Sequence, residues 1–254
     1  MTLYSTQAFA FTGKPYEDAN CVMALLMDAD ENPLTDSSGE GNTGALKGAN
    51  EPDYATASNP GAWSTGYYDW DGTDDLVTVT DDDTLDLDGK LLSFSFWVYN
   101  DLATSAIDQG FFDKADVNGD EGWDRYSIYL EWNRIRIRIN GNAEDDTHYG
   151  EEMSWNDGWH HVYVEINIGG TLFLYVDGST QTLDDTTENN ATFANLSDNL
   201  LIGKSTTTNE FTNGKMDEMA MFNRALTSTE INDIMDNGLA GAAAPAARRV
   251  IMVN

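Results

Sequence analysis

Apolar and polar residues alternate one by one along much of the chain, and this period of two is typical of β-strands with one buried face. The clearest case is LLSFSFWVYN, residues 91–100, in which Leu92, Phe94 and Phe96 would share one face. Turn-forming Gly, Asn and Asp residues separate the alternating segments. The pattern therefore predicts an all-β protein built as a sandwich. Further strands are predicted within residues 75–80, 126–140, 160–178, 199–204 and 215–222.

Two of these segments predict β-hairpins. The first, residues 126–140, reads YSIYLE, a WN turn and RIRIRIN, and the second, residues 160–178, turns on a Gly-Gly pair. In RIRIRIN, isoleucines and arginines face opposite sides of the strand. The arginine face, Arg134, Arg136 and Arg138, would either grip an anionic partner or pair with acidic residues on a neighbouring strand.

One segment departs from the strand pattern. Residues 227–238, TSTEINDIMDNG, combine a Thr/Ser start and a capping-box acid, Glu230, with Ile231 and Ile234 on one face and Gly238 as a stop. These features predict one short C-terminal helix, which we expect to pack against the end of the sandwich.

Charge narrows the range of partners. The 254 residues contain 13 Lys and Arg against 44 Asp and Glu, a net charge of −31. Binding to phosphate needs an excess of cations, so we expect neither nucleic acid nor an anionic membrane as a partner. A length of 254 residues is enough for one large β domain or two small ones, and a hydrophobic content of 41% is ample for a packed core. The single cysteine, Cys21, cannot form an intrachain disulfide and is predicted to be a small core residue.

The two ends differ from the middle of the chain. Residues 1–19 show no strong period, and residues 239–254 combine small residues, two arginines and an apolar tip. We therefore predict an N-terminal arm (1–19), one sandwich domain (20–238) and a C-terminal arm (239–254), with a last strand folding back as the alternative for the C-terminal segment. The start does not resemble a signal peptide, and no apolar run is long enough to span a membrane, so no membrane insertion is expected.

Two adjacent histidines, His160 and His161, raise the question of zinc or acid–base chemistry. Successive residues of a strand point to opposite faces, so both cannot bind one metal in the usual way. The alternation places His160 on the buried face beside Trp159 and His161 on the wetter face. We interpret the pair as part of a central strand rather than as an active site.

Four segments, in this order and spacing, resemble laminin-G-like domains of the concanavalin A-like lectin/glucanase superfamily. They are DSSGEGNTGALKG, the strand–loop–strand around WDGTDD, GWHHVYVEINIGGTLFLYVDG, and NGKMDEMAMFNRALTSTEINDIMDNG. The resemblance spans roughly residues 19–238. It implies a jelly-roll sandwich of two antiparallel sheets with one concave face, glycan or protein partners, and in many members a bound calcium ion. A fold of this kind does not fix a function.

The resemblance also suggests a structural Ca²⁺ site. The turn DSSGEGN offers hard oxygen ligands, and Gly39 and Gly41 allow its backbone carbonyls to point inward. In the family the matching loop lies near the aspartate that corresponds to Asp217. We therefore predict Asp36, Asn42, Asp217 and a backbone oxygen near Gly39 as ligands, with an Asx-type turn that holds no ion as the alternative.

Exposed tryptophans are the candidates for glycan binding, because the apolar faces of sugars stack on aromatic rings. Trp123 precedes the first predicted hairpin and Trp132 lies in its turn, and these two are the preferred platforms. A purely structural role is the alternative for each.

The sequence does not point to catalysis. Glucanases of this superfamily carry an E-x-D-x-x-E run on one strand, and neither that run nor a G-x-S-x-G nucleophile motif occurs here. Asp217 and Glu218 are adjacent and would face opposite sides of their strand. We therefore expect a non-enzymatic protein.

Among non-enzymatic roles, we predict a structural and adhesive component of a phage virion surface, either a capsid decoration or a tail- or fibre-associated module. It would belong to a larger assembly or homo-oligomer and contact other virion proteins or a cell-surface glycan. The alternative is a secreted, extracellular bacterial carbohydrate-binding or adhesion module, and a glycoside hydrolase ranks last.

Overall fold

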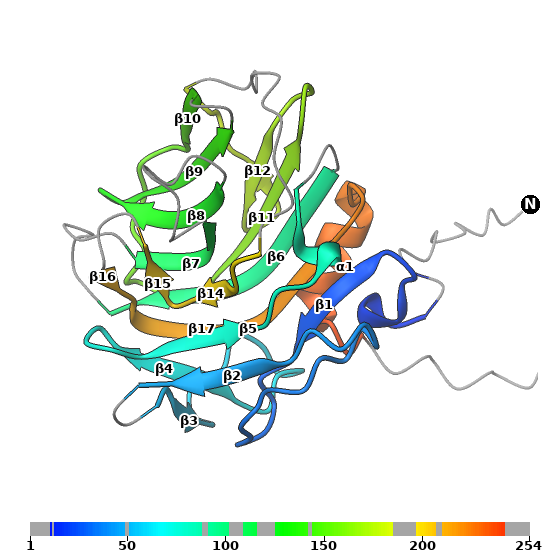
Figure 1. The fold of residues 1–254 in the computed structure, drawn as a ribbon. Helices are drawn as coiled ribbons and strands as arrows, with labels where there is room; N and C mark the ends of the chain where they lie inside the picture. Colours follow the sequence, from blue (N-terminus) through cyan, green and yellow to red (C-terminus); the bar gives the residue numbers. More distant parts are fainter. Residues whose placement is uncertain are drawn as a thin grey trace, which may run out of the picture.

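The computed structural model contains two antiparallel β-sheets that pack face to face (Figure 1). It describes residues 11, 13–48, 51–87, 91–101, 109–115, 125–141, 144–184, 197–206 and 210–241. The eight-stranded sheet has the order β13-β12-β11-β6-β17-β4-β3, and β1 pairs with β17 beside this path. Its strands are β1 (Cys21–Leu25), β3 (Asp53–Ala55), β4 (Tyr67–Asp71), β6 (Leu91–Asn100), β11 (His160–Asn167), β12 (Phe173–Val176), β13 (Ser179–Thr180) and β17 (Asn213–Phe222).

The seven-stranded sheet has the order β10-β9-β8-β7-β14-β5-β2. Its strands are β2 (Gly44–Lys47), β5 (Leu76–Val79), β7 (Gln109–Ala115), β8 (Arg125–Glu131), β9 (Arg134–Gly141), β10 (Glu144–Tyr149) and β14 (Leu200–Ile202). A small third sheet pairs β15 (Lys204–Ser205) with β16 (Glu210–Phe211). The helical elements are the 3-10 turns η1 (Pro15–Glu17) and η2 (Asp83–Leu85) and the α-helix α1 (Ser228–Asn237).

The main core fills the space between the two large sheets. Alternate residues of β6 point inward, and Phe94 and Phe96 meet Phe112 and Phe111 of the opposite sheet with ring centroids 5.1 Å apart in each pair. The isoleucines of β9 are buried in the same cluster. This arrangement confirms the predicted all-β, concanavalin A-like sandwich of two antiparallel sheets.

A second apolar cluster lies on the outer face of the eight-stranded sheet. The predicted helix is present as α1, and Thr227 and Glu230 form the predicted capping box at its start. Ile231 and Ile234 pack against Tyr163 of β11 and Ala220 of β17. The helix therefore covers a face of the sandwich (Figure 1), whereas we expected it at the end.

The second cluster reaches beyond both predicted domain boundaries. Phe11 and Leu239, which the sequence assigned to the two arms, are buried in it. Cys21 is buried there too, and burial raises the pKa of its thiol far above the usual range. Of the two predicted arms, residues 1–10, 12 and 242–254 lie outside the described residues. Within the described part of the chain, no helix has the length and apolar character needed to cross a membrane.

Candidate functional site

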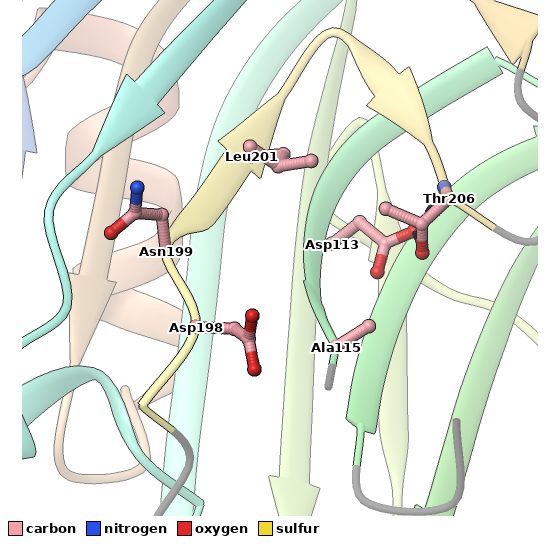
Figure 2. Close-up of a pocket in the computed structure, with 6 residues that line it drawn as sticks. All are labelled: Asp113, Ala115, Asp198, Asn199, Leu201 and Thr206. Carbon is pink, nitrogen blue, oxygen red and sulfur yellow. Dashed lines mark hydrogen bonds between the residues drawn. The ribbon is translucent and has the colours of Figure 1, made fainter. Parts of the chain in front are cut away.

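A pocket opens on the outer face of the seven-stranded sheet, between β7 and β14 (Figure 2). Its volume is about 150 Å³. The lining residues come from three stretches that are far apart in the sequence: Asp113, Ala115, Asp198, Asn199, Leu201 and Thr206.

Strand geometry explains why these side chains meet. Leu200 and Ile202 point into the main core, so Leu201 between them points outward. Leu201 and Asp113 are register partners on β14 and β7. Directly opposed residues of an antiparallel pair share a face, and the pocket therefore combines an apolar floor with a carboxylate.

Hydrogen bonds hold the polar lining in place. Asp113 Oδ2 accepts from the Thr206 backbone N–H at 2.7 Å and from its Oγ1 at 2.9 Å. On the other side of the sheet, the fully buried ammonium of Lys114 donates to the backbone oxygen of Asp198 at 2.7 Å. Lys114 also pairs with Asp81 at 2.5 Å and Asp86 at 3.2 Å. The pocket is therefore a preformed set of acceptors beside an apolar patch, which suits a ligand rich in hydroxyl groups.

The hairpin tip between β8 and β9 exposes a large aromatic side chain. Trp132 is 72% exposed, more than any other large apolar residue among the described residues. Trp132 and Asn133 have φ angles of 54° and 60°, as in the type I′ turns that join tight hairpins. The carbonyl of Asn133 accepts from Trp155 Nε1 at 2.9 Å, which ties the tip to the neighbouring loop. The other predicted glycan platform, Trp123, lies outside the described residues.

The arginine face of β9 is tied down within the sheet at Arg136. Its guanidinium carbon lies 5.0 Å from the ring centroid of Tyr129 and 5.1 Å from that of Tyr149. Its Nη1 pairs with Glu131 of β8 at 2.9 Å. The sequence left open whether this face binds an anionic partner or pairs with acidic residues of a neighbouring strand. Arg136 pairs with an acidic residue of the neighbouring strand.

The predicted calcium loop forms an Asx-type turn around one carboxylate. Asp36 Oδ1 accepts from the N–H groups of Ala24 and Ser38, and its Oδ2 accepts from Gly41 N, Asn42 N and Ser38 Oγ, all within 3.0 Å. Gly39 and Gly41 both have a φ of 92°, which glycine adopts without strain. The Asn42 amide donates to the Val22 carbonyl at 2.7 Å. The donors around Asp36 alone account for the shape of the loop.

Asp217 has partners of its own, none of them shared with Asp36 among the contacts above. Its Oδ2 accepts from Ser64 Oγ at 2.7 Å and its Oδ1 from the Glu218 N–H at 2.9 Å. The four residues named as calcium ligands thus form two separate hydrogen-bonded groups in this structure. Binding of Ca²⁺ by Asp36, Gly39, Asn42 and Asp217 stays a prediction.

The neighbour of Asp217 is a feature that the sequence pattern missed. Glu218 has a φ of 52° and lies in a register shift of β17, so the simple alternation of faces fails here. Both carboxyls are buried, and Glu218 Oε2 accepts from the Leu239 N–H. Burial, reinforced for Asp217 by the adjacent Glu218, raises both pKa values, that of Glu218 to about 8.

The two histidines lie on opposite faces, as predicted, but their surroundings differ from the prediction. His161 is fully buried and bonds Ser95 Oγ through Nε2 at 2.9 Å, and burial lowers its pKa to about 4. The prediction of a wetter face for His161 is wrong, because on that side of the sheet its ring packs against Trp97 with centroids 5.3 Å apart, and the neighbouring Tyr163 lies under α1. His160 contacts Asp177 at 2.8 Å and Asp157 at 3.1 Å, and the hydrogen bond to Asp177 raises its pKa.

The fold agrees with a comparison against protein families. Residues 71–232, more than half of the chain, match the Laminin_G_3 model, described as the Concanavalin A-like lectin/glucanases superfamily. The chain therefore belongs to this superfamily. No curated protein matches its sequence.

Solved structures share the fold at low sequence identity. The binding domain of Paraclostridial Mosquitocidal Protein 1 superposes with a TM-score of 0.64 at 14% identity, over 87% of this chain and 52% of that one. A structure of botulinum neurotoxin type C, whose cell entry depends on interaction with two ganglioside molecules, has a TM-score of 0.61 at 16% identity, over 87% of this chain and 51% of that one. The chain thus spans about half the length of these toxin domains.

A third structure is matched along nearly its whole length. Domain 4 of AbnA, a GH43 extracellular arabinanase from Geobacillus stearothermophilus in complex with arabinotriose, has a TM-score of 0.60 at 18% identity. The match covers 87% of this chain and 98% of that domain. At these identities the likeness shows the fold alone.

Proposed function

We propose that the protein is a non-enzymatic binding module whose outer-sheet pocket takes a sugar residue of a glycan. The observation that carries the proposal is the pocket itself, in which carboxylate and amide groups stand beside the apolar side chain of Leu201. Sugar hydroxyls donate to such acceptors, while the apolar C–H face of the ring packs on aliphatic carbon. Its volume of about 150 Å³ lies below the roughly 300–1,000 Å³ of pockets that enclose drug-sized ligands, so one unit of a longer glycan is the better fit.

Similar folds supply supporting cases. The AbnA domain was solved with arabinotriose, and a botulinum neurotoxin DC binding domain was solved with SialylT. Cell entry of the type C neurotoxin depends on interaction with two ganglioside molecules. Another neurotoxin DC structure contains rat synaptotagmin II, a protein partner. Together they make a glycan the first choice for this module and a protein receptor the second.

Trp132 would supply a stacking platform for another part of the same glycan. The pocket borders Ala115, which pairs with Arg125 at the start of β8, whereas Trp132 directly follows the end of that strand. Seven residues of β-strand extend over about 20 Å, so one ligand that touches both places must be an oligosaccharide.

The geometry at Asp113 favours binding over catalysis. A general acid in glycoside hydrolysis needs a carboxyl group free to give up a proton to the glycosidic oxygen. Asp113 Oδ2 instead accepts two hydrogen bonds from Thr206, so this oxygen is already held as an acceptor. An acceptor held in this way can orient a sugar hydroxyl.

The biological setting proposed for this module is a surface. A net charge of −31 keeps such a domain soluble and away from nucleic acid. We propose a virion surface, where the module would contact other virion proteins or a cell-surface glycan, with an extracellular bacterial protein as the alternative. Recovery of the protein with salt-washed particles supports the first setting, and recovery only as free monomer contradicts it.

Glycan-array screening followed by calorimetry tests the binding proposal. Asp198→Ala removes a pocket carboxylate but keeps the backbone oxygen that Lys114 holds, and the exposed Asp236→Ala on α1 is a charge-matched control. Loss of one charged hydrogen bond, about 1.5–3 kcal/mol, predicts roughly 10- to 100-fold weaker binding in Asp198→Ala only. Equal affinities for the two variants and wild type would show that the glycan does not use this pocket.

A further inference from the structure

Three aspartates gather at the turn between β4 and β5. Asp71 ends β4, and Asp74 and Asp75 directly precede β5. One carboxylate oxygen from each lies within 4.8 Å of the others. Because β4 belongs to the eight-stranded sheet and β5 to the seven-stranded sheet, this turn is one of the crossings between the two layers of the sandwich.

Asp75 gives this group an unsatisfied buried oxygen. The residue is only 2% exposed, and its Oδ1 has no hydrogen-bond partner among the described residues. Oδ2 accepts from the Asp71 N–H at 3.0 Å. The Gly48 backbone packs so closely that a Cβ at that position would lie 2.7 Å from Oδ1. A carboxylate oxygen buried in this way needs a donor, a proton or a cation.

The surroundings favour a cation over a proton. The charged neighbours that act most strongly on Asp75 are Asp71, Asp74 and Asp53, and all three are acidic. A single proton would satisfy one oxygen and leave the other carboxylates in repulsion, whereas a divalent cation is attracted by all of them at once. Calcium binds oxygen at 2.3–2.6 Å, so two ligands of one ion lie at most about 5 Å apart, which accommodates the observed spacing.

We infer that Asp71, Asp74 and Asp75 bind one divalent cation, with calcium as the best fit, and that this ion fastens the crossing between the two sheets. The site is separate from the calcium ligands predicted at Asp36, Asn42 and Asp217. Asp71 is exposed, so water molecules can complete the coordination sphere. The ion would neutralise part of the dense negative charge where β4 passes into β5.

Terbium luminescence on the chelator-treated full-length chain tests the site, because Trp70 is next to Asp71 in the sequence and can sensitise a bound lanthanide. Asp71→Asn is the test variant. Its amide oxygen can still accept from the Thr73 N–H, as Asp71 Oδ1 does at 2.7 Å, so the turn is preserved. Glu40→Gln, an exposed acid in the Asp36 loop, is the matched control.

We expect tryptophan-sensitised terbium emission that calcium displaces, with at least tenfold weaker binding in Asp71→Asn and unchanged binding in Glu40→Gln. Calcium should raise the melting temperature of wild type and Glu40→Gln clearly more than that of Asp71→Asn. Absence of emission in wild type, or equal affinity in Asp71→Asn, overturns the inference. A third outcome also overturns the inference: Asp75→Asn melts at a higher temperature than wild type, and the melting temperature of wild type does not respond to calcium. This outcome would mean that the buried oxygen of Asp75 carries a proton instead of a cation.

Discussion

Acidification should destabilise the fold through His161, because this imidazole is buried in its neutral form. Its pKa is about 4 in the folded protein, owing to burial, against about 6.5 in an unfolded chain. Between pH 4 and pH 6.5, His161 is protonated in the unfolded chain but neutral in the folded protein. The contribution of His161 to the free energy of unfolding is therefore fully present above pH 6.5 and is lost as the pH falls toward 4. A difference of 2.5 pKa units corresponds to about 3 kcal/mol at pH 4.

His161→Gln isolates this effect, since glutamine stays neutral and can still bond Ser95. Urea unfolding followed by tryptophan fluorescence at pH 7, 6, 5 and 4, with chelator present, gives the free energy of unfolding of each protein. Carboxylates titrate in both, so the test is the difference between the two curves. We expect wild type to lose about 3 kcal/mol more than His161→Gln between pH 7 and pH 4. Parallel curves would refute the reasoning. His160→Gln is the control of opposite sign, because the raised pKa of His160 gives stability below pH 6.5 that is lost as the pH rises.

Three further substitutions test other parts of the structure. Glu218→Gln should stabilise the chelator-treated protein more at pH 9 than at pH 5, by a few kcal/mol. Glu218 has a pKa of about 8 in the folded protein against about 4.5 in the unfolded chain, so the wild type loses stability as the pH rises from about 4.5 through 8, whereas glutamine does not ionise. Denaturant titrations at both pH values measure this, and an equal effect at both would contradict it. Lys114→Met should cost about 3–5 kcal/mol by leaving the buried Asp86 without its ion pair, and a melting temperature close to that of wild type would show that the pair contributes little. Ile234→Ala should cost about 2–5 kcal/mol through a cavity under α1, and a loss below 1 kcal/mol in urea unfolding would mean that the helix does not contribute to the fold as described.

The sandwich was predictable because its main core obeys a local rule. Strands such as β6 and β9 expose alternate residues to one shared interior, and that alternation is visible in the sequence. The outer face of β11 could not be predicted in the same way. In the sequence, His161 and Tyr163 look like the solvent side of a half-buried strand. In the structure, His161 packs against Trp97, and Tyr163 packs under α1, which follows more than sixty residues later.

The candidate sites also differ in whether a local sequence pattern predicts them. The exposure of Trp132 follows from a local WN turn, which the sequence shows directly. The pocket forms only because residues 113, 198 and 206 come together in the fold, and no local sequence pattern predicts that these distant residues meet. The irregularity at Glu218 also defeats a period-two reading, because one residue with a positive φ shifts all later residues of β17 relative to the earlier ones.

Cys21 gives the protein a built-in probe of its own motions. The thiol lies in β1 beneath the cluster that joins α1 to the eight-stranded sheet, and burial keeps its pKa far too high for a reactive thiolate at neutral pH. A thiol reagent can therefore modify it only during moments when β1 or the helix separates from the sheet. The rate of labelling in native buffer then measures how often this layer opens, without any engineered label. Since the chain has no second cysteine, the signal comes from a single position, and oxidants cannot trap the open form as an intrachain disulfide.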